Sequence, residues 1–97
     1  MKRLILISAL LFSFNGWSYS ETDLEKLNTT NACVGCDLSG ADLTYASLNY
    51  ADLRNADLRN ANLYHANLSG ANLNDANLSD ANLNDANLSD AYLAYTN

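Results

Sequence analysis

The side chains best suited to chemistry in this sequence are two cysteines and one histidine. Cys33 and Cys36 form a Cys-Val-Gly-Cys motif, and His65 is the only histidine in the chain. A redox-active motif of this spacing occurs in a thioredoxin-like βαβ context, which the surrounding sequence lacks, and a zinc site needs four ligands. Two interpretations are favoured: a disulfide between Cys33 and Cys36 in an oxidising compartment, or two small buried thiols.

The sequence contains no recognisable catalytic constellation. It has no Ser-His-Asp spacing, no phosphate-binding loop and no metal-ligand set. Carboxylates are abundant, with 11 Asp and Glu residues. In the stacked coils that the repeats described below predict, they lie on the outer surface, where no pocket would shift their pKa values. We therefore expect a protein that is not an enzyme and needs no cofactor or metal, with His65 as a surface residue.

The first twenty residues have the organisation of a secretory signal peptide. Lys2 and Arg3 precede an apolar run over residues 4–14, and Ser18 and Ser20 then form a small-x-small cleavage site. The alternative is a membrane anchor, but the run is well short of the ~20 residues that a membrane-spanning helix needs. The pattern predicts cleavage after Ser20 and a periplasmic or secreted protein that has no membrane contact after cleavage.

Removal of this segment leaves an acidic mature chain, residues 21–97. Lys26, Arg54 and Arg59 remain against 11 acidic residues, so the formal charge is 3 − 11 = −8. Such a charge argues against nucleic acid or an anionic membrane surface as a partner.

An uninterrupted period of five begins at Cys36 and continues almost to the end of the chain. Leucine stands at every fifth position from Leu38 to Leu93, and alanine stands two places earlier from Ala41 to Ala91, with Cys36 in the first such place. On an α-helix, steps of five rotate by about 140° and scatter the leucines round every face. On a strand, odd spacing puts successive leucines on opposite faces. A chain that turns a corner every five residues points all of them inward, and stacked coils of that chain then make the core.

The repeat unit A(D/N)LXX, as in residues 71–75, resembles the pentapeptide-repeat family over residues 36–95. The resemblance implies an all-β fold, a right-handed four-sided β-helix solenoid with one coil per four repeats. About three coils are then expected, in a stack roughly 14 Å tall at a strand spacing of ~4.8 Å. The expected organisation is a signal peptide (1–20), a capping helix and junction (21–35) and a β-helix (36–97). Some members of the family dimerise through the C-terminal end, which implies a homodimer as one possible assembly.

Both ends of the expected stack need protection, because an open end exposes backbone groups. Residues 22–31 predict a short helix that begins with a capping box of Thr22 and Glu25 and carries two leucines on one face. At the other end, either Tyr92 and Tyr95 fold over the last coil or two molecules meet end to end.

Outward aromatic residues form a candidate partner patch. A coil of twenty residues brings Tyr45, Tyr64 and His65 to one side, with Tyr50 round the corner. Tyrosine is favoured at protein interfaces, so these residues predict a protein contact. The alternative is that they are tolerated surface aromatics.

A second outward feature is an acidic belt in the last place of four repeats: Asp75, Asp80, Asp85 and Asp90. The belt fits either turn-favouring residues in solvent or a basic partner protein. Calcium fits poorly, because consecutive aspartates fall on different sides of the coil. The stacking also predicts side-chain amide ladders, as between Asn62 and Asn82, and an Arg59 that relieves repulsion between Asp37 and Asp57.

These observations favour a non-enzymatic exported protein that is structural or mediates protein–protein interaction, with a partner that the sequence does not identify. The alternative, implied by the family resemblance, is a DNA mimic that binds a DNA-handling enzyme such as gyrase. The charge of −8 is close to the roughly eight charges that ~14 Å of duplex carries. The short stack and the cytoplasmic location of gyrase weigh against the alternative.

Overall fold

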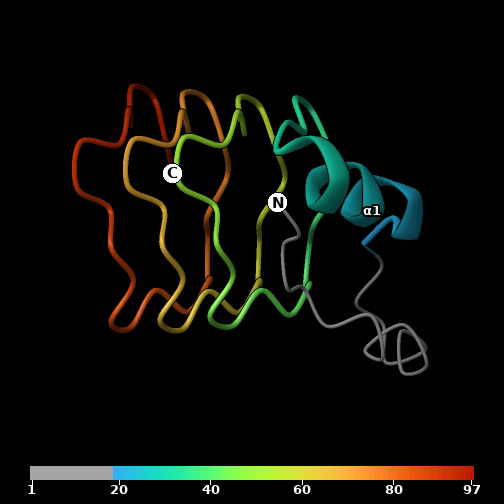
Figure 1. Ribbon diagram of the computed structural model, residues 1–97, viewed down its shortest axis with the longest axis horizontal. Helices are drawn as coiled ribbons and strands as arrows, with labels where there is room; N and C mark the ends of the chain where they lie inside the picture. The colour runs from blue at the N-terminus through green and yellow to red at the C-terminus, as the bar shows by residue number, and fades with distance from the viewer. Residues whose placement is uncertain (1–18) are drawn as a thin grey trace.

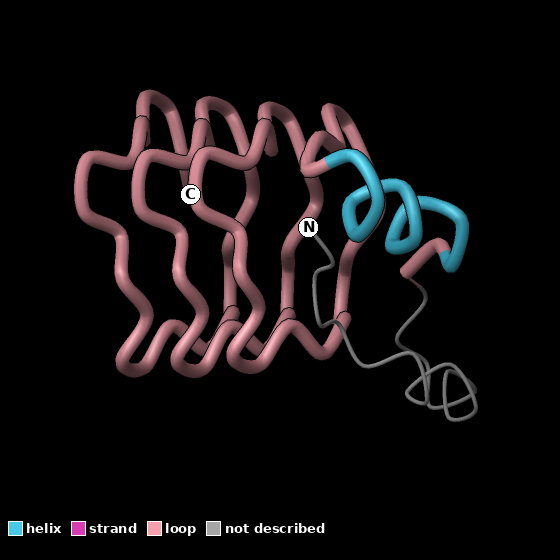
Figure 2. Tube along the Cα trace, in the orientation of Figure 1, coloured by secondary structure: helices cyan, strands magenta, loops and turns pink. Residues whose placement is uncertain are grey.

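The computed structural model describes residues 19–97, so the signal peptide predicted for residues 1–20 lies outside the described residues except for Tyr19 and Ser20. The described chain has one helix, α1 (Glu21–Thr30), followed by a regular stack of turns and loops (Figures 1 and 2). Within residues 19–97, no strand is longer than a single bridging residue. No helix of this part of the chain is long and apolar enough to cross a membrane.

Helix α1 begins at a cap that the sequence analysis assigned to the signal peptide. The hydroxyl of Ser20 accepts the Asp23 N–H at 3.2 Å, and its carbonyl accepts the first intrahelical bond. The prediction of Thr22 as the cap is wrong, because Thr22 lies inside the first turn, with its hydroxyl 3.0 Å from that of Ser20. The helix ends at Asn31, whose left-handed backbone donates to the Leu27 carbonyl, a common way for a helix to stop.

Polar and apolar contacts hold α1 against the N-terminal end of the array (Figure 1). Leu24 and Leu27 are buried in the same cluster as the leucines of the array. The Ser20 N–H donates to the Asp37 carbonyl at 2.9 Å, and the Asp37 N–H donates to the Asp23 carboxylate at 2.9 Å. These two bonds run in opposite directions between the start of the helix and the start of the array, and so fix their relative position.

The array is joined by nine parallel bridges, each between a residue and the one twenty places later. Asn62, for example, bridges to Asn82, and the Leu43 N–H donates to the Asn62 carbonyl at 2.8 Å. The Asn62 N–H in turn donates to the Ala41 carbonyl at 2.9 Å. The chain therefore returns to the same side every twenty residues, with the bridging residues five apart.

A left-handed residue closes each five-residue segment. Every fifth residue from Gly35 to Tyr95 has a φ between 57° and 71°. At each corner the alanine N–H donates back to the leucine carbonyl three residues earlier, as from Ala61 to Leu58 at 3.1 Å. A positive φ turns the chain sharply and ends the extended segment after one bridge, which explains why no longer strand forms.

The inward positions predicted from the period of five are confirmed by burial over most of the array. The leucines from 38 to 73 and the alanines from 41 to 76 are almost fully excluded from solvent. Leucine burial is the main favourable term here, at about 2 kcal/mol for each side chain removed from water. The buried alanines belong to the same cluster as the leucines.

The C-terminal end of the array is open, and the expectation of twelve buried leucines is wrong there. Leu83 and Leu88 are only partly buried, and Leu93 is 46% exposed. Of the two alternatives for this end, the one in which Tyr92 and Tyr95 fold over the last coil is wrong, since both residues are exposed. Within residues 19–97, the N–H groups of Leu83, Leu88 and Leu93 have no backbone acceptor.

Candidate functional site

Three outward side chains contact one another on one side of the array, and we call them the aromatic cluster: Tyr45, Tyr64 and His65. The rings of Tyr45 and His65 are stacked, with centroids 4.8 Å apart and planes within 3°. Tyr64 meets both rings edge-on, at 4.4 Å from His65 and 5.9 Å from Tyr45. Tyr45 and His65 are exposed and Tyr64 is half-buried, so the cluster offers an ordered aromatic surface to solvent.

The register of the array produces the cluster. Tyr45 and His65 are twenty residues apart, so they occupy the same turn position in successive coils. The Tyr45 N–H donates to the Tyr64 carbonyl at 2.8 Å, which holds the backbones of the two segments side by side. The prediction from the sequence that these residues share one side therefore matches their geometry.

A left-handed backbone is costly for the tyrosines at two of the turn positions. Tyr45 and Tyr50 have φ values of 61° and 62°, whereas most equivalent positions hold Gly, Asn or Asp. The left-handed conformation costs a bulky L-residue roughly 1 kcal/mol or more. Stacking on His65, at about 0.5–1.5 kcal/mol, offsets that cost for Tyr45.

Tyr50 stands apart from the aromatic cluster and lies over Gly70. A Cβ atom placed on Gly70 would come within 2.5 Å of the Tyr50 Cε1 atom. Gly70 thus combines the positive φ that the turn requires with the space that the Tyr50 ring occupies. Among the described residues no aromatic ring pairs with Tyr50, whose side chain is 75% exposed.

His65 also contacts an acidic residue that the sequence analysis did not connect with it. The His65 Nε2 atom lies 3.5 Å from the Asp85 carboxylate, again at a separation of twenty residues. The signal was present in the sequence, because positions 45, 65 and 85 form one column if a coil holds twenty residues. Asp85 therefore joins the aromatic cluster to the acidic belt.

The acidic belt consists of exposed turn residues. Asp75, Asp80, Asp85 and Asp90 all have left-handed backbones, with φ between 60° and 65°. Asp tolerates this conformation better than most residues, so the turn alone accounts for its choice. Within residues 19–97, no group of three or more His, Cys, Asp and Glu side chains is arranged to hold a metal ion.

Two arginines pair with aspartates in the middle of the array. Arg59 makes a bidentate contact with Asp57 at 2.8 and 2.7 Å, as the sequence analysis expected, and Arg54 does the same with Asp52. Hydrogen bonding from Arg59 lowers the pKa of the Asp57 carboxyl. The same bond, followed by the charges of Asp57 and Asp37, raises the pKa of Arg59.

The asparagines at the bridging positions bond along the chain, whereas the side-chain carbonyl of Asn74 accepts the Ala94 N–H of the next coil at 2.8 Å. The Asn62 side-chain carbonyl accepts the Tyr64 N–H at 3.1 Å, and Asn82 accepts the Asn84 N–H at 3.0 Å. The predicted ladder between Asn62 and Asn82 is therefore wrong. A local bond to the N–H two residues later is the usual alternative for this side chain, and here it supports the turn.

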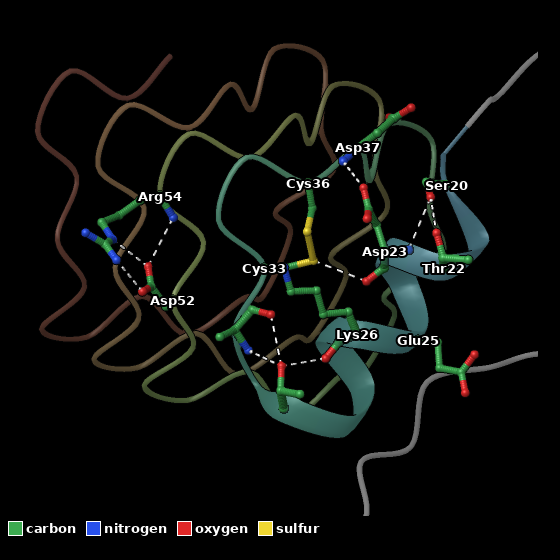
Figure 3. The surroundings of a disulfide bond; sticks show 12 residues. Ser20, Thr22, Asp23, Glu25, Lys26, Cys33, Cys36, Asp37, Asp52 and Arg54 are labelled. Carbon is green, nitrogen blue, oxygen red and sulfur yellow. Dashed lines mark hydrogen bonds and ion pairs between the residues drawn. A yellow bond between two sulfur atoms is a disulfide. The ribbon is translucent and has the colours of Figure 1, made fainter.

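Cys33 and Cys36 form a disulfide at the junction of α1 and the array (Figure 3), with their Cα atoms 5.3 Å apart. Both residues are buried, and the Cys33 N–H donates to the Asp52 carbonyl at 2.7 Å. The disulfide lies close to Asp23 and Asp37, which connect the helix to the array (Figure 3). The disulfide therefore has a structural role, because it lies between α1 and the array, which pack on each other.

A comparison with protein families matches the chain to pentapeptide repeats, with eight copies over residues 36–75 and 71–97. A comparison with curated proteins gives no significant match.

Solved structures similar to this chain include three cyanobacterial pentapeptide repeat proteins. HetL of Nostoc sp. strain PCC 7120, described as involved in heterocyst differentiation regulation, is 34% identical over 64% of this chain, with a TM-score of 0.46. The chain covers only 38% of HetL. A second Nostoc protein is 31% identical, with 82% of this chain and 75% of that protein covered and a TM-score of 0.31. Rfr23 of Cyanothece 51142 is 23% identical, with coverages of 78% and 94% and a TM-score of 0.25.

Proposed function

The chain belongs to the pentapeptide-repeat family, whose members fold as right-handed β-helices and generally serve as interaction modules, and we propose that it is an exported, non-enzymatic member that binds a protein partner. The partner patch consists of Tyr45, Tyr50, Tyr64 and His65. We further propose that the array is a four-sided β-helix of about three coils, with α1 as its N-terminal cap.

The observation that carries this proposal is the presence of large aromatic residues at turn positions where they do not favour the fold. Most equivalent positions hold Gly, Asn or Asp, which tolerate a positive φ. Tyr45 and Tyr50 are 65% and 75% exposed at such positions, so core packing does not explain them. Ordered tyrosine side chains bury a large area on binding and lose little conformational entropy.

Export is supported by the leader sequence and by the disulfide. Lys2 and Arg3 followed by an apolar segment are typical of a secretory signal peptide. A disulfide between Cys33 and Cys36 persists in the periplasm or outside the cell, where the environment is oxidising. The proposed location is therefore periplasmic or secreted.

The charge pattern favours this function over DNA mimicry. Asp52 and Asp57 are paired with Arg54 and Arg59 in the middle of the array, so their charges do not continue the acidic surface. The acids of the belt lie at turn positions nearer the C-terminal end, and none of them contacts an arginine in the part of the chain that the structure describes. A surface with acids in one zone and ion pairs in another is a weak imitation of the evenly spaced phosphates of duplex DNA.

The test is a binding experiment with variants that keep the repeat pattern. In the triple variant Tyr45→Asn, Tyr50→Asn and Tyr64→Ser, each residue is replaced by one found at equivalent positions of this chain. The matched control is Tyr95→Asn, which removes an exposed tyrosine from a turn position of the same kind away from the patch. Circular dichroism and thermal unfolding should show that both variants stay folded.

We expect the wild type and the control to capture the same protein from the exported fraction, and the triple variant to lose it by at least tenfold in affinity. Capture by all three proteins alike would contradict the patch. Capture of no protein by the wild type would favour a purely structural role, and capture of gyrase from the cytoplasm would favour the DNA-mimic alternative.

A second copy of the chain is the proposed occupant of the open C-terminal end. Leu93 is 46% exposed there, beside the exposed Tyr92 and the unpaired N–H groups of the last coil. Apolar surface next to an unpaired edge favours association. Sedimentation should give a dimer for the wild type and a monomer for Leu93→Asp; a monomeric wild type would contradict a homodimer.

A further inference from the structure

We propose that the signal peptide is cut after Ser18, so that the mature protein begins with Tyr19 and retains both Tyr19 and Ser20. The inference rests on the proposed export of the protein and concerns the position of the cut, which the sequence alone placed after Ser20. A leader is discarded, so residues that the folded domain uses belong to the mature chain. Both residues that precede α1 are used in this way.

Ser20 makes contacts in two directions at the start of α1. Its hydroxyl accepts the Asp23 N–H at 3.2 Å, and its carbonyl accepts the Leu24 N–H at 2.9 Å. Its own N–H donates to the Asp37 carbonyl at 2.9 Å, which joins the helix to the array. Figure 3 shows Ser20 beside Asp23, Thr22 and the helix start. A cut after Ser20 would remove all three bonds.

Tyr19 is also part of the folded domain. Its side chain is 8% exposed and belongs to the same buried cluster as Leu24 and the leucines of the array. Burial raises the pKa of the Tyr19 hydroxyl, and the nearby carboxylates of Glu21 and Asp42 raise it further. Asp42 belongs to the array, so Tyr19 lies against the array as well as next to the helix.

The charge created by cleavage also favours the earlier cut. A cut after Ser20 would place the new α-ammonium group on Glu21, the first residue of α1, where the positive end of the helix dipole opposes it. A cut after Ser18 places that charge on Tyr19, which lies outside the helix and before its N-cap residue Ser20.

The sequence supplies an equally suitable cleavage site for the earlier cut. Gly16 and Ser18 stand at the −3 and −1 places of a cut after Ser18, and both are small. Trp17 lies between them at the −2 place, where the small-x-small rule sets no size limit. Ser18 and Ser20 satisfy the same rule two residues later, so the leader sequence permits both cuts and the contacts of Tyr19 and Ser20 in the fold favour the earlier one.

The test is the first residue of the exported protein, read by N-terminal sequencing and intact mass after expression of the full chain in an exporting bacterium. We expect Tyr19 as the first residue. Glu21, or any other internal first residue, would overturn the position of the cut while leaving export intact. A chain that keeps Met1 in every fraction would overturn the proposed export together with the cut.

Two variants separate the cleavage registers in pulse-labelled precursor, where folding of the product is not required. Gly16→Phe places a bulky residue at −3 of the proposed site alone, and Ser20→Asp places a charged residue at −1 of the later site alone while keeping a helix-capping side chain. We expect Gly16→Phe to slow processing at least tenfold or to move the first residue to Glu21. Ser20→Asp should be processed like the wild type. The reverse pattern would overturn the proposal.

Discussion

At the residue scale, the residues that close the turns all need a positive φ, and not all of them are of a type that tolerates it. All thirteen positions from 35 to 95 at steps of five have a positive φ. Gly, Asn and Asp fill nine of them, and Tyr45, Tyr50, His65 and Tyr95 fill the rest. The acidic belt belongs to the first group, so its aspartates are explained by the turn. The tyrosines of the second group are not explained by the turn, and for Tyr45 and Tyr50 the proposed explanation is binding of a partner.

The ion pair of Arg59 with Asp57 gives a pH-dependent prediction. Because folding lowers the Asp57 pKa below its unfolded value of about 3.9, the contribution of this pair to stability is full above about pH 4 and is lost as the pH falls through the lowered pKa. In Arg59→Ala, the Asp57 pKa should rise toward its ordinary value, as measured by carboxyl-carbon NMR titration. Arg54→Ala should move the Asp52 pKa and leave that of Asp57 in place. An Asp57 pKa that is the same with and without Arg59 would refute the pairing in solution.

At the element scale, α1 illustrates which parts of a helix the sequence predicts and which it does not. The burial of Leu24 and Leu27 follows from their spacing on one face. The cap does not follow, because Ser20 satisfies two patterns at once, a leader cleavage site and a helix N-terminus. Its bond to the Asp37 carbonyl is a tertiary contact that no local pattern indicates.

Two variants, one at Ser20 and one at Thr22, test which residue caps α1. Ser20→Ala should destabilise the protein by about 1 kcal/mol, which corresponds to a decrease in Tm of roughly 4–8 °C for a domain of this size. Thr22→Ala should change stability by less than about 0.5 kcal/mol, because its hydroxyl bonds only to that of Ser20. Chemical denaturation of the full chain measures both. Equal effects, or a larger effect at Thr22, would argue for the capping box expected from the sequence.

At the scale of the whole molecule, the period of five predicts which residues point into the array but not how far the residues at its ends are buried. Inward positions follow from periodicity because segments twenty residues apart lie side by side, and Leu24 and Leu27 of α1 pack in the same cluster as the leucines of the first coil. Leu93 has a neighbour on one side only, which explains its exposure. The contact of His65 with Asp85 likewise depends on the length of a coil, which the period of five leaves open. The sequence did not predict the bond from the Tyr64 N–H to the Asn62 side chain. This local bond competes for the same side chain with the amide ladder expected between coils.

Two substitutions compare the stability contribution of a leucine in the interior with that of a leucine at the open C-terminal end. Leu63→Asp places a carboxylate in the middle of the stack, where Leu63 is fully buried. An uncompensated buried charge costs several kcal/mol, which is comparable to the whole stability of a small domain, so this variant should not fold. Leu93→Asp should remain folded, because Leu93 is 46% exposed within one chain, and should lose only the stabilisation that association with a second copy supplies. Circular dichroism and urea unfolding give the comparison, and a soluble, cooperatively unfolding Leu63→Asp protein would refute the inward assignment.

The central claim is that segments twenty residues apart lie side by side round one apolar interior, and nuclear Overhauser contacts between backbone protons test it most directly. The bridges predict strong contacts from Asn62 to Asn82 and from Asn67 to Asn87, together with slow amide exchange at Leu43 and Leu63, whose N–H groups donate to the next coil. Helical contacts three and four residues apart beyond residue 36, or no long-range contacts at all, would contradict the fold and the surfaces that depend on it.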